Sequence, residues 1–197
     1  MSDGSLPTFR FPASTHIVQV QPPQHGSVTM GSSALEVFTD LAQIRAATVP
    51  PQTSLGQAEL KMIYQGVRLL FVVSDMPSVD GILTAADIAG DRPMRLVHQR
   101  QVKYQELTAA DVMTPLSDID AITFASLQRA TVQQVVATLI QRGRPHLLVV
   151  DSETADGSPR IRGLISQTQV ERQLGHPLPV TSMAQTFSEL EQVLAGH

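Results

Sequence analysis

The sequence predicts a mixed α/β fold in which two related units face each other across a pseudo-twofold axis. The first observation behind this prediction is an internal repeat, because segments of residues 33–90 recur in the same order over residues 108–175. The second is that each unit alternates helical runs with short apolar runs of strand length. The third is size, since a unit of about 60 residues makes only a marginal core alone. Paired units would bury both sets of strands and leave two related clefts between them.

Two pairs of segments in the repeat are predicted to be helical. Each unit begins with a residue that can cap a helix, followed by a short apolar stretch, at Ser33–Thr39 and Thr108–Thr114. A longer helix follows at Ser54–Gly66 and Thr131–Gly143. Each starts at Ser or Thr, carries Gln three residues later and stops at a glycine suited to a left-handed C-cap. Both carry apolar residues at i, i+4 and i+8, with one lapse at Glu59: Leu55 and Ile63, and Val132, Val136 and Ile140.

The other two pairs have the length and composition of strands. Leu69–Val73 matches His146–Val150 as a short apolar run. Gly81–Asp87 matches Gly163–Gln169, and in both a strand leads directly into a helix. Each unit is therefore predicted to run short helix, helix, strand, strand, helix.

Three further segments complete the domain organisation. Residues 1–32 contain four prolines and only two charged residues, which favours a flexible arm, and Thr15–Gln21 alternates enough to form one short strand in it. Residues 91–107 connect the units and are expected to be partly helical. Residues 176–197 are predicted to form a C-terminal helical tail, in which four apolar residues recur at helical spacing: Met183, Phe187, Leu190 and Leu194.

Composition excludes several classes of protein. The chain has 197 residues, a formal net charge of −4 and no cysteine, so a disulfide framework, a thiol nucleophile and a thiolate metal site are ruled out. The mildly acidic total argues against general nucleic-acid binding. No apolar run approaches the roughly 20 residues that cross a bilayer, and no secretory signal is recognisable. We expect a cytoplasmic protein that binds neither nucleic acid nor membrane.

No catalytic constellation is recognisable in the sequence. The Gly-x-Ser-x-Gly elbow, the Gly-x-x-x-x-Gly-Lys loop and the His-x-x-x-His pair are all missing, and the six histidines are scattered. Asp118 and Asp120 carry carboxylates of the kind that bind a hard cation, but such a pair is more often part of a polar loop. The sequence therefore predicts that the chain is not an enzyme and has no metal site and no required cofactor. An enzyme whose site forms only in the fold is a third hypothesis.

The ordered pattern resembles the CBS-domain pair, or Bateman module. The residues that carry the resemblance are Asp111–Thr114, Gly143–Asp151 and above all Gly81–Asp87, and it extends over about 33–175. It implies two β-α-β-β-α units related by a pseudo-twofold axis, and a homodimer shaped as a flat disc. It also implies a regulatory role with an adenine nucleotide (AMP, ADP or ATP) or S-adenosylmethionine as ligand. Since the flanking segments are short, it implies a stand-alone module that acts on an unknown effector protein.

Thr84 and Asp87 are the strongest candidates for ligand contact. A strand is predicted to end near Leu83, so Thr84 lies at the N-cap of the next helix and Asp87 lies one turn further on, on the same side. A carboxylate can accept hydrogen bonds from both hydroxyls of a ribose, and the resemblance implies this role for the matching Thr and Asp. Gly81 lets the backbone bend or approach closely. The alternative is that Thr-x-x-Asp only caps the helix.

The second unit differs at the equivalent position. Ser166 and Gln169 keep the capping box but lose the carboxylate, which predicts one competent nucleotide site and one degraded site. The resemblance implies that the leading segment of each unit helps to hold the base: Val37, Phe38 and Thr39 for the first site, and Met113 and Thr114 for the second.

Basic residues of the second unit are candidates for binding phosphates. Three of them are assigned to the first site: Arg144, His146 and Arg162. Ordinary core packing for the apolar candidates, and a solvated or ion-paired face for the basic ones, are the alternatives.

Two functions from different classes fit these features. The first is a ligand-sensing module, in which a nucleotide between the units favours one of two conformations and signals to a partner or to the chain's own dimer. The alternative is a structural or protein-interaction module with vestigial clefts, which the loss of the carboxylate at Gln169 supports.

Overall fold

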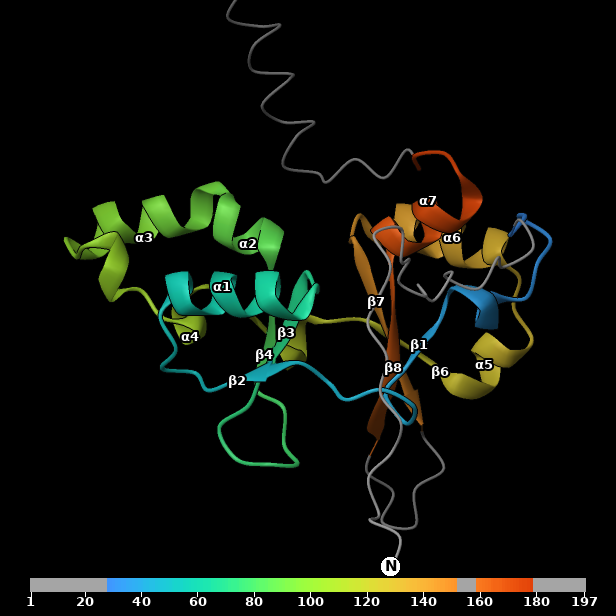
Figure 1. The fold of residues 1–197 in the computed structure, drawn as a ribbon, viewed down its shortest axis with the longest axis horizontal. Helices are drawn as coiled ribbons and strands as arrows, with labels where there is room; N and C mark the ends of the chain where they lie inside the picture. Colours follow the sequence, from blue (N-terminus) through green and yellow to red (C-terminus); the bar gives the residue numbers. More distant parts are fainter. Residues whose placement is uncertain (1–27, 152–158, 179–197) are drawn as a thin grey trace, which may run out of the picture.

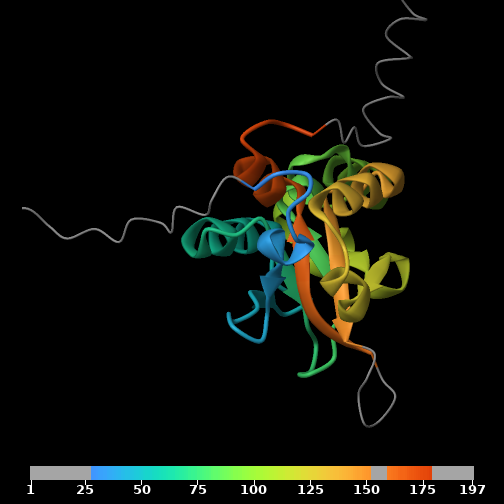
Figure 2. The ribbon, with the colours of Figure 1, turned by 90° about the vertical axis from the view of Figure 1, so that its right-hand side faces the viewer.

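The computed structural model describes residues 28–151 and 159–178. Two four-stranded sheets lie at its centre, and Figures 1 and 2 show helices outside them, with α1 and α6 on opposite sides. The strand predicted at Thr15–Gln21 and the tail helix predicted from residue 182 onward lie outside the described residues. No helix in the described ranges is long and apolar enough to cross a membrane.

The two sheets have the same topology. One has the order β1 (Thr39–Asp40), β8 (Arg160–Ser166), β7 (His146–Asp151) and β6 (Ala121–Thr123). The other has the order β2 (Thr48–Val49), β3 (Leu69–Val72), β4 (Gly81–Thr84) and β5 (Thr114–Pro115). In each, an antiparallel hairpin has a parallel strand on one side and a short antiparallel strand on the other. The mixed α/β class and the two β-α-β-β-α units are confirmed.

The helices surround these sheets. The long helices are α1 (Leu55–Gln65), α3 (Asp91–Arg100), α6 (Val132–Arg142) and α7 (Gln167–Leu174). Shorter turns of helix are η1 (Ala34–Val37), α2 (Ala85–Ala89), η2 (Tyr104–Glu106), α4 (Ala109–Val112), η3 (Leu116–Asp118) and α5 (Phe124–Gln128). The segment between the units is helical over α3, as the sequence predicts.

Helices α1 and α6 begin and end where the sequence predicts. The Ser54 hydroxyl accepts a hydrogen bond from the Gln57 amide at 3.4 Å, and Thr131 forms a capping box with Gln134. The helices end at Gly66 and Gly143, whose φ angles of 64° and 59° lie in the left-handed region that favours glycine.

Only some of the apolar residues at i, i+4 and i+8 of these helices are buried. Ile63 and Ile140 are 67% and 42% exposed. Helix α1 instead buries Leu55, Ala58 and Met62, and α6 buries residues spaced by three and four: Val132, Val135, Val136 and Leu139. The i+8 positions have rotated away from the core, because 3.6 residues per turn favour i+3 and i+7 over a strict interval of four.

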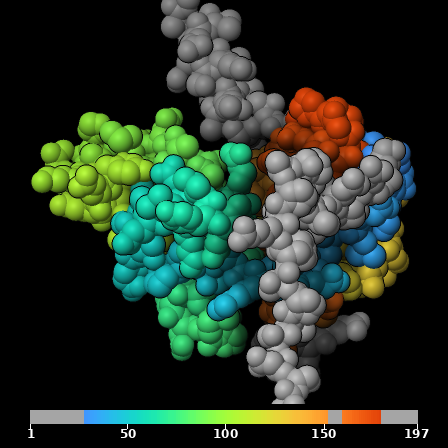
Figure 3. Space-filling model, viewed as in Figure 1, coloured from blue at the N-terminus to red at the C-terminus, as the bar shows by residue number. Residues whose placement is uncertain are grey.

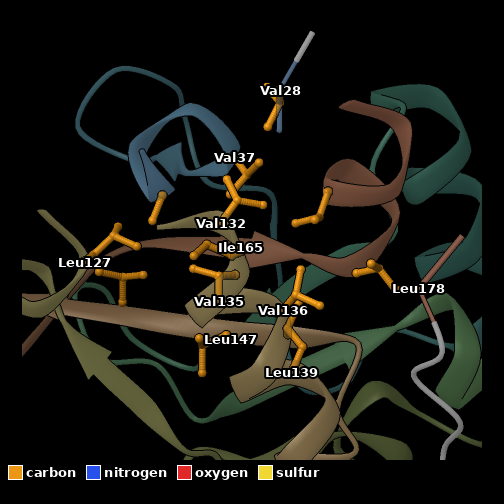
Figure 4. Packing of buried hydrophobic residues seen from close by; sticks show 13 residues of the cluster. Val28, Val37, Leu127, Val132, Val135, Val136, Leu139, Leu147, Ile165 and Leu178 are labelled. Carbon is orange, nitrogen blue, oxygen red and sulfur yellow. The ribbon is translucent and has the colours of Figure 1, made fainter. Parts of the chain in front are cut away.

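The leading segment of each unit crosses to the other sheet. Strand β1 pairs with β8, and β5 pairs with β4. Accordingly, Val37 is buried in a cluster with residues of α6 and β7 (Figure 4), while Val112 is buried with residues of α1 and β3. Each sheet therefore includes one short strand that comes from the start of the other unit in the sequence.

A third apolar cluster joins the two sheets. Leu69, Phe71 and Ile82 of one sheet pack with Leu148 of the other, all at most 7% exposed. Burial of these strand faces against each other holds the two halves together and determines where the clefts between them lie.

Candidate functional site

A cleft of about 390 Å³ lies between the two halves and contains the predicted ligand-binding residues. Its volume falls within the roughly 300–1,000 Å³ typical of small-molecule sites. The end of β4 and the start of α2 contribute Thr84 and Asp87. The segment from β5 onward contributes Thr114, Ile119 and Asp120. The end of α6 and the start of β7 line the opposite wall, and they contribute Arg142, Gly143, Arg144, Pro145, His146 and Leu147.

Thr84 and Asp87 form a complete capping box at the edge of this cleft. One carboxylate oxygen of Asp87, Oδ2, accepts hydrogen bonds from the Thr84 amide at 2.8 Å and the Thr84 hydroxyl at 2.6 Å. The Asp87 amide donates in return to the Thr84 hydroxyl at 3.1 Å. Oδ1 accepts no hydrogen bond from any residue that the structure describes. Capping therefore occupies one oxygen of Asp87 and leaves the other available to a ligand.

Thr108 and Asp111 provide an internal comparison, because they form the same box at the start of α4. Asp111 Oδ2 accepts from the Thr108 amide at 2.9 Å and from its hydroxyl at 2.8 Å, while Oδ1 pairs with Arg100. Burial opposes the charge of Asp111, but hydrogen bonds from Thr108 and Arg100 outweigh it and lower its pKa. The second oxygen of Asp111 thus has a protein partner, whereas that of Asp87 has none among the described residues.

Ser166 and Gln169 do not form the full capping box that the sequence predicts. The Ser166 hydroxyl accepts from the Gln169 amide at 3.2 Å, but the Gln169 side chain does not return to the cap. Instead, Gln169 Oε1 accepts a hydrogen bond from the Thr39 hydroxyl at 3.0 Å. The prediction is wrong for the Gln169 side chain because β1 pairs with β8, which brings Thr39 within hydrogen-bonding distance of it. Gln169 and Thr39 correspond to Asp87 and Thr114, and at the second site they therefore form a hydrogen bond with each other.

The leading segments reach the opposite sites from those the sequence suggests. Val37, Phe38 and Thr39 are not brought to Thr84 and Asp87, since Val37 is in the core and Thr39 bonds to Gln169. Thr114, assigned by sequence to the second site, lines the cleft beside Thr84. The physical reason is the strand crossing, which pairs each leading segment with the hairpin of the other unit.

Two glycines make this crossing possible. A Cβ atom on Gly81 would clash with the Thr114 carbonyl and lie 3.2 Å from the Met113 sulfur. A Cβ on Gly163 would clash in the same way with the Thr39 carbonyl and the Phe38 ring. Gly81 therefore acts by allowing close backbone approach, which places Met113 and Thr114 at the site.

Two of the predicted basic residues do lie in the cleft. Arg144 is exposed, and its guanidinium forms no ion pair or hydrogen bond with a described residue. His146 is largely enclosed, and its Nδ1 has no hydrogen-bond partner among the described residues. Burial is the main cause that lowers the pKa of His146 to about 4; Asp87 opposes the shift and Arg68 adds to it to a smaller extent. His146 is thus neutral near pH 7, while Arg144 offers an unpaired positive charge.

Arg162 is engaged elsewhere. Its Nε and Nη2 donate to the two carboxylate oxygens of Asp40 at 2.8 and 2.9 Å, and its guanidinium lies 4.8 Å from the centre of the Phe124 ring. The hydrogen bond from Arg162 lowers the pKa of Asp40. These residues line a separate cavity of about 550 Å³, with Phe38 and Thr39 among the others. That larger cavity is a weaker candidate for phosphate, because its two charged residues neutralise each other.

Two residues of the cleft lie outside the sequence motifs: Ile119 and Asp120. Asp120 lies at the rim, where its Oδ2 is 3.4 Å from Nη1 of Arg142. A signal for them exists in the repeat, since Ile44 and Arg45 follow β1 at the same interval as Ile119 and Asp120 follow β5. No group of three potential metal ligands occurs among the described residues.

Comparisons with known proteins agree with this fold. Residues 38–91 match the family model of the CBS domain. No curated protein matches the sequence. Among solved structures, an uncharacterised conserved protein from Pyrococcus horikoshii has a TM-score of 0.52 and 19% identity over 74% of this chain and 93% of that chain. A further CBS-domain structure has a TM-score of 0.50 and 19% identity over 72% of this chain and 96% of that one.

A third structure is that of CBSX2 in complex with AMP. It has a TM-score of 0.48 and 19% identity, over 72% of this chain and 95% of that one. Identities this low establish a common fold and nothing finer. Residues 38–91 are thus similar to the CBS domain, and the chain shares the fold of the CBS-domain structure that has a TM-score of 0.50.

Proposed function

We propose that this chain is a regulatory module that senses an adenine nucleotide in the cleft between its two halves. The ribose hydroxyls donate to Asp87, the base enters the apolar part of the cleft near Ile82 and Ile119, and the phosphate binds Arg144. The observation that carries the proposal is that one cleft contains two groups with no hydrogen-bond partner among the described residues: Asp87 Oδ1 and the Arg144 guanidinium. A carboxylate and a guanidinium are the side chains best suited to a diol and a phosphate, respectively.

Regulation follows from where the cleft lies. Thr84 and Asp87 belong to one half, whereas Arg144 and His146 belong to the other. A ligand that bridges both walls favours the arrangement in which they are correctly spaced, and it acts only through its different affinity for two arrangements. An effector protein or a second copy of the chain then binds the ligand-bound arrangement and the ligand-free arrangement with different affinity. This function requires no catalytic group.

The proposal is tested by titration calorimetry with AMP, ADP, ATP and S-adenosylmethionine against the wild type and Asp87→Asn. Asparagine can still accept the hydrogen bonds from Thr84, so the cap is retained, but the charge that strengthens the ribose contact is lost. Hydrogen bonds to charged groups are worth about 1.5–3 kcal/mol, so we expect affinity to fall by roughly 10- to 100-fold.

Asp111→Asn is the matched control. It makes the same change in the same capping box, but Asp111 is not among the residues that line the cleft. We expect its nucleotide affinity to equal that of the wild type. Equal affinity of Asp87→Asn and wild type would contradict the assignment of the ribose to Asp87.

A protein-interaction module without a ligand is the second candidate. The Thr39–Gln169 hydrogen bond favours it, because it occupies the polar groups of the second cleft internally. If none of the four compounds binds or raises the melting temperature, this second function is the better account.

A further inference from the structure

The charged side chains that line the cleft balance, and this limits the ligand that fits it; Arg68, which acts on His146, is not among the lining residues. Two carboxylates, Asp87 and Asp120, and two guanidiniums, Arg142 and Arg144, line the same cavity. His146 lies beside Asp87 and is uncharged near pH 7, since its pKa is lowered to about 4. A site built for three phosphates would be expected to carry a clear excess of positive charge.

Only one of the two arginines is available to a ligand. Arg142 already lies 3.4 Å from the carboxylate of Asp120, and both side chains are about half exposed, at 52% and 59%. Arg144 has no such partner among the residues that the structure describes. A ligand with its ribose on Asp87 thus finds one free guanidinium, which is enough for a single phosphate.

Asp120 adds a second carboxylate to the lining of the cleft, next to Arg142. It lies at the rim beside Arg142, so a chain of phosphates that continues from Arg144 toward Arg142 approaches this carboxylate. The cleft volume of about 390 Å³ is near the lower end for small-molecule sites, which also favours a compact ligand.

We propose that Asp120 makes this cleft selective for nucleoside monophosphates over triphosphates. The inference rests on the proposed function, since it concerns the ligand of the same cleft. Asp120 acts by repelling the outer phosphates and by holding Arg142 away from them. It contributes specificity and not the basic affinity for the nucleoside, which depends on Asp87.

The expected size of the effect is modest because Asp120 is exposed. Coulomb's law in water makes one like-charge contact at about 7 Å worth roughly threefold in binding. The two extra charges of ATP over AMP raise this to roughly sevenfold. Screening reduces it to about twofold at about 0.15 M salt and to about fivefold at about 0.01 M salt.

The test compares dissociation constants for AMP and magnesium-free ATP in the wild type, Asp120→Asn and the control Asp118→Asn. Asp118 is exposed and two residues away but does not line the cleft. We expect the wild type to prefer AMP. We expect Asp120→Asn to bind ATP about fivefold more tightly at about 0.01 M salt and about twofold more tightly at about 0.15 M salt, while its AMP affinity changes less. We expect Asp118→Asn to match the wild type. The gain for ATP should grow at low salt.

Other outcomes overturn the inference. Equal affinity of the wild type for AMP and ATP contradicts it, as does an unchanged ratio in Asp120→Asn with a normal thermal unfolding midpoint. Either result leaves the proposed function standing, provided that AMP binding still depends on Asp87. If no nucleotide binds in an Asp87-dependent way, both the proposed function and this inference fail.

Discussion

The loss of a carboxylate at Gln169 leads to a specific prediction about the second cleft. If this loss is what disables the second ribose site, Gln169→Asp should restore it. In the first unit, the aspartate at this position accepts hydrogen bonds from the cap at 2.8 and 2.6 Å and keeps one oxygen free. Ser166 stands at the N-cap in the same relation to residue 169. A new aspartate there can make the same contacts.

Gln169→Asp should change the free energy of unfolding only slightly, because the contacts that it removes and adds are of similar strength. Gln169→Asp removes the hydrogen bond from Thr39, worth about 1 kcal/mol, and completes a capping box worth a similar amount. We therefore expect the free energy of unfolding to change by less than about 1 kcal/mol. Cationic side chains for a phosphate exist at or next to the equivalent places. Arg68 directly precedes β3, one residue after the position that matches Arg144, and Arg45 occupies the position of Asp120.

Titration calorimetry with AMP measures how many nucleotides bind to each chain. The wild type should bind one nucleotide per chain, and Gln169→Asp should bind two. Asp87→Asn combined with Gln169→Asp should bind one, at the new site. A stable Gln169→Asp protein that still binds only one nucleotide would refute the argument that the missing carboxylate disables the second cleft.

Two further predictions concern the surface and the pH dependence of stability. Helix α1 lies on the face of the molecule seen in Figure 3, and its residues Leu60, Ile63 and Tyr64 are exposed. We propose that this side of α1 is buried in a homodimer. Ile63→Lys should then shift the mass in sedimentation velocity from dimer to monomer, and a wild-type monomer at high concentration would contradict the proposal. The pKa of Asp111 is lowered in the folded protein, so its charge stabilises the fold above about pH 4, and that contribution is lost as pH falls through the folded pKa. In urea unfolding, Asp111→Asn should be less stable than the wild type at pH 7, and the difference should shrink below about pH 4; a constant difference across this range would contradict the assignment.

Local contacts explain why much of the site is predictable from sequence. The cap at Thr84, the position of Asp87 one turn later and the glycine ends of α1 and α6 all depend on residues three or four apart. Such contacts form wherever the helix forms, so the residue types at those spacings are sufficient to predict them. Arg144 and His146 follow from their place directly after one of these helix ends.

The sequence by itself determined the repeat, the mixed α/β class, the capped helices and the Thr84–Asp87 pair. Only the tertiary structure decided which leading segment meets which cleft, because that depends on contacts between distant residues. Thr39 bonds to Gln169 130 positions away, and Arg162 bonds to Asp40 122 positions away. The burial of two sheets against each other fixes these pairs, and no local spacing encodes them. The same packing turned Arg162 away from the cleft and placed Asp120 at its rim.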